Sequence, residues 1–215
     1  MVIEELAGHG RALPSGVVAF LFSDIEGSTR LLATLGEAYK PLLADHRRLL
    51  RAVWAERDGA EVGTEGDSFF VAFARPSDAI RAARDAQLAL AEHDWGATPV
   101  RVRIGLHAGE ASLEDDDYTG MAVHLAARVS AAAHGGQVLL TEACRALGAE
   151  ALGATLGTMD LGPHRLKDIP DEVALHQLTG AGLRDDFPPL RTMERYRTNP
   201  ARATDQLRRT RERGE

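Results

Sequence analysis

Short apolar runs alternate along this chain with longer segments whose apolar residues recur at helical spacing. The clearest run, Val17 to Phe22 (VVAFLF), is rich in β-branched and aromatic residues and predicts a buried strand that ends at Ser23-Asp24. Between Ser28 and Arg57 the leucines recur every three or four residues, with a break near Gly36, which predicts two helices. Strands and helices interleaved in this way predict an α+β domain with one mixed sheet covered by helices on one face.

The rest of the chain extends this pattern. The Gly-bearing turn Gly63 to Asp67 lies between two apolar runs and predicts a hairpin with Asp67 at its tip. Pro76 begins a predicted helix that ends near His93, and a polar, acidic loop is expected from Gly109 to Tyr118. The Ala-rich segment from Met121 to Ala133 predicts another helix. Further strands are predicted at residues 100–106, 137–140, 161–166 and 173–178, with a short helix after residue 140.

Composition excludes several classes of protein. No window approaches the roughly 18 uninterrupted apolar residues that a membrane span requires, and residues 1–13 lack the features of a signal peptide. We therefore expect no membrane contact and a cytoplasmic location. The single cysteine, Cys144, makes a disulfide framework or a zinc site improbable. The net charge is −7, with +3 on residues 181–215 and −10 on the remainder, and an acidic body makes nucleic acid an unlikely partner.

Two aspartates at turns are candidates for metal binding. Asp24 follows the first strand, where a carboxylate can bind Mg²⁺ while the N–H groups of the next helix, at Gly27, Ser28 and Thr29, face a phosphate. Taken alone, Asp24 is more often a helix cap. Asp67 is preceded by Gly66, which allows close backbone approach, and taken alone it is an ordinary turn residue.

A third feature is the segment that begins at Asp117. His124 and Arg128 are four residues apart, so a helix projects both from one face among small residues. The alternatives are that Arg128 is a solvated surface arginine and that Asp117 caps the helix or adds charge to its first turn.

Together these segments resemble the class III nucleotidyl cyclases, the adenylyl and guanylyl cyclase homology domain. The resemblance covers residues 15–180 and rests on four motifs in the family's order: FSDIEGST, EGDSFF, DYTGMAVHLAARVSAAAHGGQVLLT and LGPHRLKDI. Any one of them is weak evidence, but a chance match to all four is very improbable. The resemblance implies a ferredoxin-like mixed sheet over residues 15–180, with residues 1–14 as an N-terminal segment and 181–215 as an Arg-rich tail or linker remnant.

The resemblance also implies a reaction and a set of site residues. Two divalent ions, Mg²⁺ or Mn²⁺, would be held by Asp24, Asp67 and the carbonyl of Ile25, and the ribose 3′-oxygen of a nucleoside triphosphate would attack its α-phosphorus with loss of pyrophosphate. Arg128 matches the family arginine that stabilises the reacting phosphate, and Lys167 matches a lysine that contacts the triphosphate. The family completes its site across a dimer, so Asp24 and Asp67 would come from one subunit and Asp117, His124 and Arg128 from the other. A homodimer is expected, and a heterodimer with another cyclase-like chain remains open.

Two residues depart from the family pattern. Gly63, followed by Thr64, stands where the family has a purine-selecting lysine, although the aspartate that accepts from the adenine amino group is present as Asp117. His124 replaces the asparagine that orients the ribose. We therefore expect a weak or base-promiscuous cyclase for ATP, with GTP as a second candidate substrate. The alternative is a catalytically silent nucleotide-binding domain with a regulatory or partner-binding role.

The tail contains FPPLRT, which resembles the linker that joins related cyclase domains to ATPase modules. Its arginines could bind nucleic acid or a protein, but arginines with interleaved glutamates more often form a solvated tail.

Overall fold

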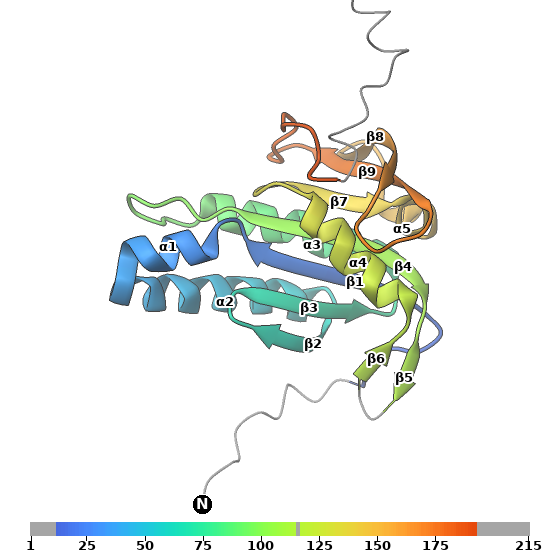
Figure 1. Cartoon of the computed structure of the whole chain (residues 1–215), viewed down its shortest axis with the longest axis horizontal. Coiled ribbons are helices and arrows are strands. Elements are labelled where there is room, and N and C mark those ends of the chain that lie inside the picture. The colour runs from blue at the N-terminus through green and yellow to red at the C-terminus, as the bar shows by residue number, and fades with distance from the viewer. Residues whose placement is uncertain (1–11, 115–116, 193–215) are drawn as a thin grey trace, which may run out of the picture.

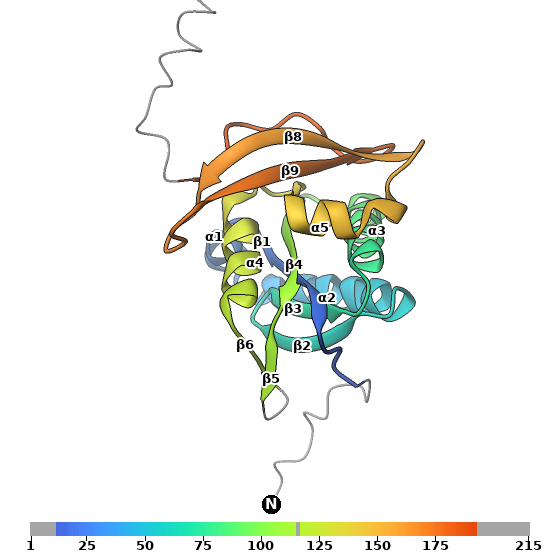
Figure 2. The same ribbon diagram turned by 90° about the vertical axis from the view of Figure 1, so that its right-hand side faces the viewer.

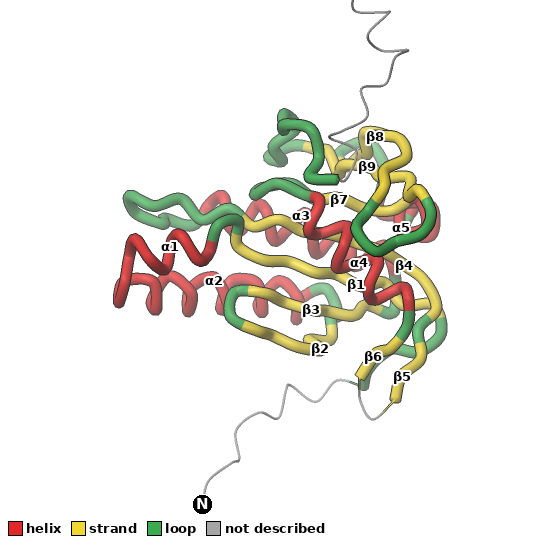
Figure 3. Tube along the Cα trace, in the orientation of Figure 1, coloured by secondary structure: helices red, strands yellow, loops and turns green. Residues whose placement is uncertain are grey.

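A computed structural model describes residues 12–114 and 117–192 of the chain. Within these residues, no helix is long and apolar enough to cross a membrane. Residues 1–11 of the predicted N-terminal segment and residues 193–215 of the predicted tail lie outside the described residues. Figure 3 shows helices and strands interleaved along the trace, as the sequence predicts.

The strands are β1 Val17–Ile25, β2 Ala60–Glu65, β3 Ser68–Phe73, β4 Val102–Glu110, β5 Ser112–Glu114, β6 Asp117–Thr119, β7 Val138–Thr141, β8 Leu156–Arg165 and β9 Glu172–Gly180. The helices are α1 Ser28–Leu35, α2 Tyr39–Glu56, α3 Pro76–Glu92, α4 Met121–Ala132 and α5 Glu142–Leu147, with 3₁₀ turns η1 Gly36–Ala38 and η2 Ala149–Ala151. The predicted break near Gly36 is confirmed, because this residue separates α1 from η1 and α2 with a φ of 54°.

Seven strands form one sheet in the order β2-β3-β1-β4-β7-β9-β8 (Figure 1). β1 lies between β3 and β4 and is antiparallel to both, while β4 and β7 are parallel. The sheet is therefore mixed, and the predicted α+β class with a mixed sheet is confirmed. β1 and β4 are central, so the apolar run of β1 is covered on both sides.

The two faces of the sheet carry different helices (Figure 2). Ala19 and Leu21 of β1 pack with α2 and α3, whereas Val18 and Phe20 pack with Ala122 and Ala126 of α4. The expectation that the helices cover one face is therefore wrong for α4. The physical reason is that alternate residues of β1 point to opposite faces and every one of them from Val18 to Leu21 is apolar, so both faces need cover.

Helix α4 lies unusually close to β4. A Cβ added at Gly105 would stand 2.1 Å from the backbone N of Ser130 and 2.4 Å from its Cα. Only glycine allows this close approach. The absence of a side chain at Gly105 therefore sets the distance between α4 and the sheet.

The acidic region after β4 differs from the prediction. The loop expected from Gly109 to Tyr118 is instead the end of β4 followed by a short antiparallel pair, β5 with β6, in which Glu114 lies opposite Asp117. Residues 115 and 116 lie outside the described residues. The pair matters for function because it carries Asp117.

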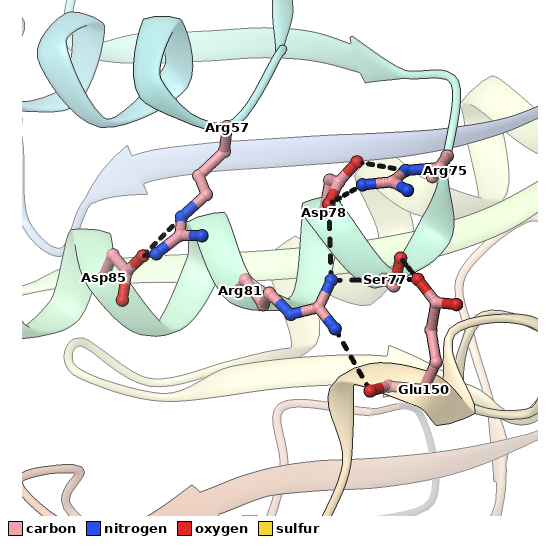
Figure 4. A network of polar contacts seen from close by, with 7 residues as sticks. All are labelled: Arg57, Arg75, Ser77, Asp78, Arg81, Asp85 and Glu150. Carbon is pink, nitrogen blue, oxygen red and sulfur yellow. Dashed lines mark hydrogen bonds and ion pairs between the residues drawn. The ribbon is translucent and has the colours of Figure 1, made fainter.

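Polar contacts fix the start of α3 (Figure 4). This helix packs on the face of the sheet opposite to α4. Pro76 is in the first turn, and Asp78 receives hydrogen bonds from Arg75 at 2.6 Å and Arg81 at 3.4 Å. The Ser77 hydroxyl donates to Glu150 of η2 at 2.6 Å. These contacts hold the α5–η2 region against α3.

Candidate active site

Asp24 and Asp67 lie together at the end of β1. Asp24 is the penultimate residue of β1, and Asp67 is in the turn between β2 and β3. The backbone N–H of Ile25 donates to Oδ2 of Asp67 at 2.7 Å, which joins the hairpin tip to the residue after Asp24. Arg47 of α2 holds the same turn, because its Nε donates to the carbonyl of Gly66 at 3.0 Å. The Asp67 side chain thus contacts a residue 42 positions away in the chain, whereas an ordinary turn aspartate bonds within its own turn. We call Asp24 and Asp67 the acidic pair.

A third residue, Arg103, partly offsets the negative charge of Asp24. It lies opposite Asp24 in the β1–β4 register, and its Nε donates to Oδ1 of Asp24 at 2.6 Å. Its Nη1 also reaches the carbonyl of Ala131 in α4 at 3.4 Å. The sequence interpretation did not identify Arg103. The available signal was a charged residue inside a predicted strand, between apolar neighbours that face the core.

The pKa of the Asp24 carboxyl is raised above its ordinary value. Burial is the main cause, and the negative charge of Asp67 adds to it, while the hydrogen bond and charge of Arg103 act in the opposite direction. Two half-buried carboxylates that repel each other favour a bound cation. Their donors are hard oxygens, which suit Mg²⁺ or Mn²⁺.

The donor set is small. Among the residues that the structure describes, no group of three or more His, Cys, Asp or Glu side chains could hold a metal ion. The acidic pair with the carbonyl of Ile25 fits a divalent ion only if the ligand's own oxygens or water complete the shell, as is common for Mg²⁺.

The residues after Asp24 form the β1–α1 junction (residues 24–29). Gly27 occupies the N-cap position of α1 with a φ of 73°, and no side chain caps the helix. The alternative that Asp24 is a helix cap is therefore wrong. The N–H groups of Ser28 and Thr29 belong to the first turn of α1, where helices leave backbone donors unpaired and favour anions.

His124 and Arg128 both lie on α4, away from the face that packs on the sheet. His124 is exposed, and Met121, on the same helix stripe, is 58% exposed. Arg128 is not a free surface arginine, because its Nη2 pairs with Oδ2 of Asp168 at 2.5 Å. Asp168 directly follows Lys167 in the connection between β8 and β9. The structure therefore brings Arg128 close to the segment that carries Lys167.

Asp117 begins β6, and its Oδ1 accepts from the N–H of Tyr118 at 2.8 Å. It does not cap α4, because the N-cap residue is Gly120 and no side-chain cap bond is made. Tyr118 is buried, and its ring lies 5.0 Å from that of Phe20 and 6.2 Å from that of Phe70. The tyrosine thus anchors Asp117 to the α4 face of the sheet.

Gly63 and Thr64 point to opposite faces. Gly63 lies opposite Phe70, whose ring is on the α4 face near Tyr118, so a side chain at position 63 would share the face of Asp117. Thr64 lies opposite Phe69, which packs in the core with α2, and its hydroxyl donates to Glu61. Strand alternation therefore turns the Thr64 side chain away from the face of Asp117.

The acidic pair and Asp117 lie at opposite ends of the central strands. Asp24 is near the end of β1, while Val17 at its start pairs with Glu110, the residue from which the chain enters β5 and β6. Asp24 lies seven positions after Val17, so about 23 Å of strand separates these two residues. The chain therefore enters the β5–β6 pair, which carries Asp117, at the end of β1 opposite to Asp24.

The chain is similar to several known proteins. The family model described as the adenylate and guanylate cyclase catalytic domain matches residues 11–178. An uncharacterized protein of Mycobacterium tuberculosis is 36% identical over 198 residues, which cover 90% of this chain and 67% of that protein. A receptor-type adenylate cyclase of Trypanosoma congolense is 33% identical over 204 residues, which cover 75% of this chain and 27% of that protein.

Solved structures of cyclases are also similar. An adenylate cyclase from Trypanosoma brucei in its monomeric state gives a TM-score of 0.75 at 29% identity and covers 85% of this chain and 95% of that one. The adenylyl cyclase CyaB from P. aeruginosa gives a TM-score of 0.63 at 22% identity and covers 80% of this chain and 97% of that one, a likeness of fold alone.

Proposed function

This chain belongs to the adenylate and guanylate cyclase catalytic domain family, and from that premise we propose that it converts ATP to 3′,5′-cyclic AMP and pyrophosphate, with GTP as a second substrate. The acidic pair is the observation that carries the proposal, because Asp24 and Asp67 come together from distant parts of the sequence through the 2.7 Å contact at Ile25. We infer that they hold two divalent ions, Mg²⁺ or Mn²⁺, which when bound acidify the ribose 3′-hydroxyl and neutralise the triphosphate.

The remaining residues act on the phosphates and the sugar. Arg128 stabilises the charge that develops on the α-phosphate, and a phosphate oxygen takes the place that Asp168 occupies in the structure described above. Lys167 adds positive charge next to it. The N–H groups of Gly27, Ser28 and Thr29 face the phosphates at the start of α1. His124 donates a hydrogen bond to the ribose from the same face of α4 as Arg128.

We propose that the active form is a homodimer with two shared sites. Each site takes the acidic pair from one subunit and Asp117, His124 and Arg128 from the other. This arrangement is supported by the strand register, because the chain enters the pair that carries Asp117 at the end of β1 opposite to Asp24.

Base selection is expected to be weak. Asp117 accepts a hydrogen bond from the adenine amino group, but Gly63 offers no donor to the ring nitrogen. The site therefore positions the base less firmly than a site with both groups, which lowers the rate. The catalytically silent alternative is motivated by the departures at Gly63 and His124. We favour turnover, because the acidic pair and Arg128, which would act on the phosphates, are present in the chain.

The test is direct. The purified chain is incubated with ATP or GTP and with Mg²⁺ or Mn²⁺, and cyclic product is measured by mass spectrometry. We expect cyclic AMP from the parent chain and none above background from Asp67→Ala. Equal signals from the parent and Asp67→Ala, under all four conditions, would refute the proposal.

A further inference from the structure

The segment that follows β9 is anchored to the domain. We call residues 185–192 the C-terminal strap; it is the orange coil beside β7 and β9 in Figure 1. Leu190 is 7% exposed and packs with Val129, Leu139 and Leu175. Two adjacent prolines, Pro188 and Pro189, restrict the backbone just before it.

Three hydrogen bonds fix the strap along its length. Gln177 Nε2 donates to the carbonyl of Asp185 at 2.9 Å, and Nε2 of His134 lies 3.1 Å from the carbonyl of Pro189. The backbone N–H of Arg191 donates at 3.0 Å to the carbonyl of Ala132, the last residue of α4. The backbone of Arg191 therefore has a defined position next to α4.

The side chain of Arg191 reaches a different element. Its guanidinium pairs with the carboxylate of Glu26, the residue that follows Ile25 in the β1–α1 junction. The backbone N–H of Glu26 donates to the carbonyl of Arg101 at 2.8 Å, and His134 Nδ1 lies 3.9 Å from its carboxylate. Arg191 also lies close enough to Asp24 that its charge lowers the pKa of that carboxyl, against the larger effect of burial.

We propose that Arg191 is a positioning residue for the metal site: through Glu26 it holds the β1–α1 junction so that Asp24 and Ile25 present their oxygens to the ion. The inference rests on the proposed function of the acidic pair and adds a residue that lies outside the four cyclase-like motifs. A partly exposed ion pair contributes little to stability by itself. Groups that orient metal ligands, by contrast, commonly change metal affinity by about 10- to 100-fold when removed.

The experiment compares Arg191→Ala with two other variants of the full chain. Arg191→Lys keeps the positive charge but replaces the planar guanidinium with an ammonium group. Arg184→Ala is the matched control, because Arg184 lies near the strap with its guanidinium 4.6 Å from the Phe187 ring centroid, and the structure shows no contact between it and Glu26. Mn²⁺ binding is measured by water-proton relaxation, with Mn²⁺ alone and with 3′-deoxy-ATP, which lacks the reacting hydroxyl. Thermal midpoints are measured without metal.

We expect Arg191→Ala to weaken Mn²⁺ binding about 10-fold or more, with Arg191→Lys between it and the parent and Arg184→Ala equal to the parent. The metal-free thermal midpoint of Arg191→Ala should differ from that of the parent no more than the midpoint of Arg184→Ala does. In the cyclase assay, the Mn²⁺ concentration for half-maximal rate should rise while the rate at saturating Mn²⁺ recovers. Glu26→Gln should add little to the effect of Arg191→Ala, because both break the same contact.

Several outcomes overturn the inference. Unchanged Mn²⁺ binding by Arg191→Ala would do so, as would a loss of binding that follows a lowered metal-free midpoint, since that marks a structural role only. A parent chain that binds Mn²⁺ and makes no cyclic product would overturn the cyclase proposal. Weaker Mn²⁺ binding by Arg191→Ala than by that parent would still support the role of Arg191. A parent chain with no Mn²⁺ binding would overturn both.

Discussion

At the scale of single residues, the negative charge of Asp24 is costly in the metal-free chain. Its pKa is raised in the folded state, chiefly by burial. The folded chain thus binds this proton more tightly than the unfolded chain, and the stabilisation is present at low pH and lost as the pH rises through the folded pKa. In its charged form the Asp24 carboxylate therefore destabilises the fold until a cation binds.

Asp24→Asn should accordingly leave the metal-free thermal midpoint equal to or above that of the parent. Mn²⁺ should raise the midpoint of the parent, more at pH 8 than at pH 5 because protons compete with the ion, and should not raise that of the variant. Differential scanning fluorimetry with and without Mn²⁺ measures both effects. Asp45→Asn, an exposed carboxylate of α2 bonded to Arg48, is the control. A metal-induced shift of equal size in parent and Asp24→Asn would show that Asp24 is not a metal ligand.

Gly63 tests how the site selects its base. A Cβ at this position would meet no atom within 4 Å, and the φ of Gly63 is not positive, so a side chain is tolerated. Gly63→Lys places a donor on the face of Asp117. One added hydrogen bond contributes about 0.5–1.5 kcal/mol, so the ratio of kcat/KM for ATP to that for GTP should rise up to about tenfold.

Thr64→Lys is the matched control for this change, because position 64 faces α2 and should leave the ratio unchanged. If Gly63→Lys folds and gains neither selectivity nor rate, the pocket does not select the base through position 63.

How far the sequence predicts the site depends on the residue. Asp24 and Asp67 are predicted because each lies in a local motif at a turn. Arg103 is not predicted, because its role depends on the register that sets it opposite Asp24, and register is a property of two strands rather than of one segment. Arg191 is missed for a similar reason, since its partner Glu26 lies 165 positions away in the chain.

At the scale of elements, the contact between α4 and β4 is the tightest constraint on the site. α4 carries His124 and Arg128, and its height above the sheet depends on the missing side chain at Gly105. A methyl group there would stand 2.1 Å from backbone N of Ser130, which a rotamer change cannot relieve. The helix must move as a whole.

Gly105→Ala should therefore destabilise the chain by about 3 kcal/mol, the upper end of the usual range for overpacking. Urea denaturation followed by circular dichroism measures this change. Gly63→Ala, with open space at its Cβ, should shift the midpoint little. Similar stabilities for the two alanine variants would mean that α4 does not pack on β4 as described.

Two features of the elements were not predicted. β5 and β6 have three residues each, too few for apolar alternation to appear in an acidic stretch. The sequence could have predicted that α4 lies on the sheet face opposite to α2 and α3, because an uninterrupted apolar strand such as VVAFLF indicates that both faces are covered. The order of strands and helices was otherwise predictable, since each long element has its own periodic pattern.

At the scale of the whole molecule, the proposed shared sites predict rescue between two inactive variants. Asp67→Ala and Arg128→Ala should each be inactive alone. In a mixed dimer one site keeps both Asp67 and Arg128, so an equimolar mixture should recover about a quarter of the parent activity if subunits exchange at random. Exchange is checked with differently tagged chains. Mixtures that exchange and stay inactive would place all the groups of a site within one chain.

In the proposed homodimer, the placement of Asp24 and Asp117 at opposite ends of β1 also sets how the rate of product formation depends on the abundance of the chain. When catalysis needs two subunits, dimers at low concentration accumulate as the square of the amount of chain made. Doubling expression then raises the rate of product formation about fourfold, and halving expression lowers it about fourfold. In the proposed homodimer, a span of strand within one protomer thus makes product formation depend steeply on gene dosage.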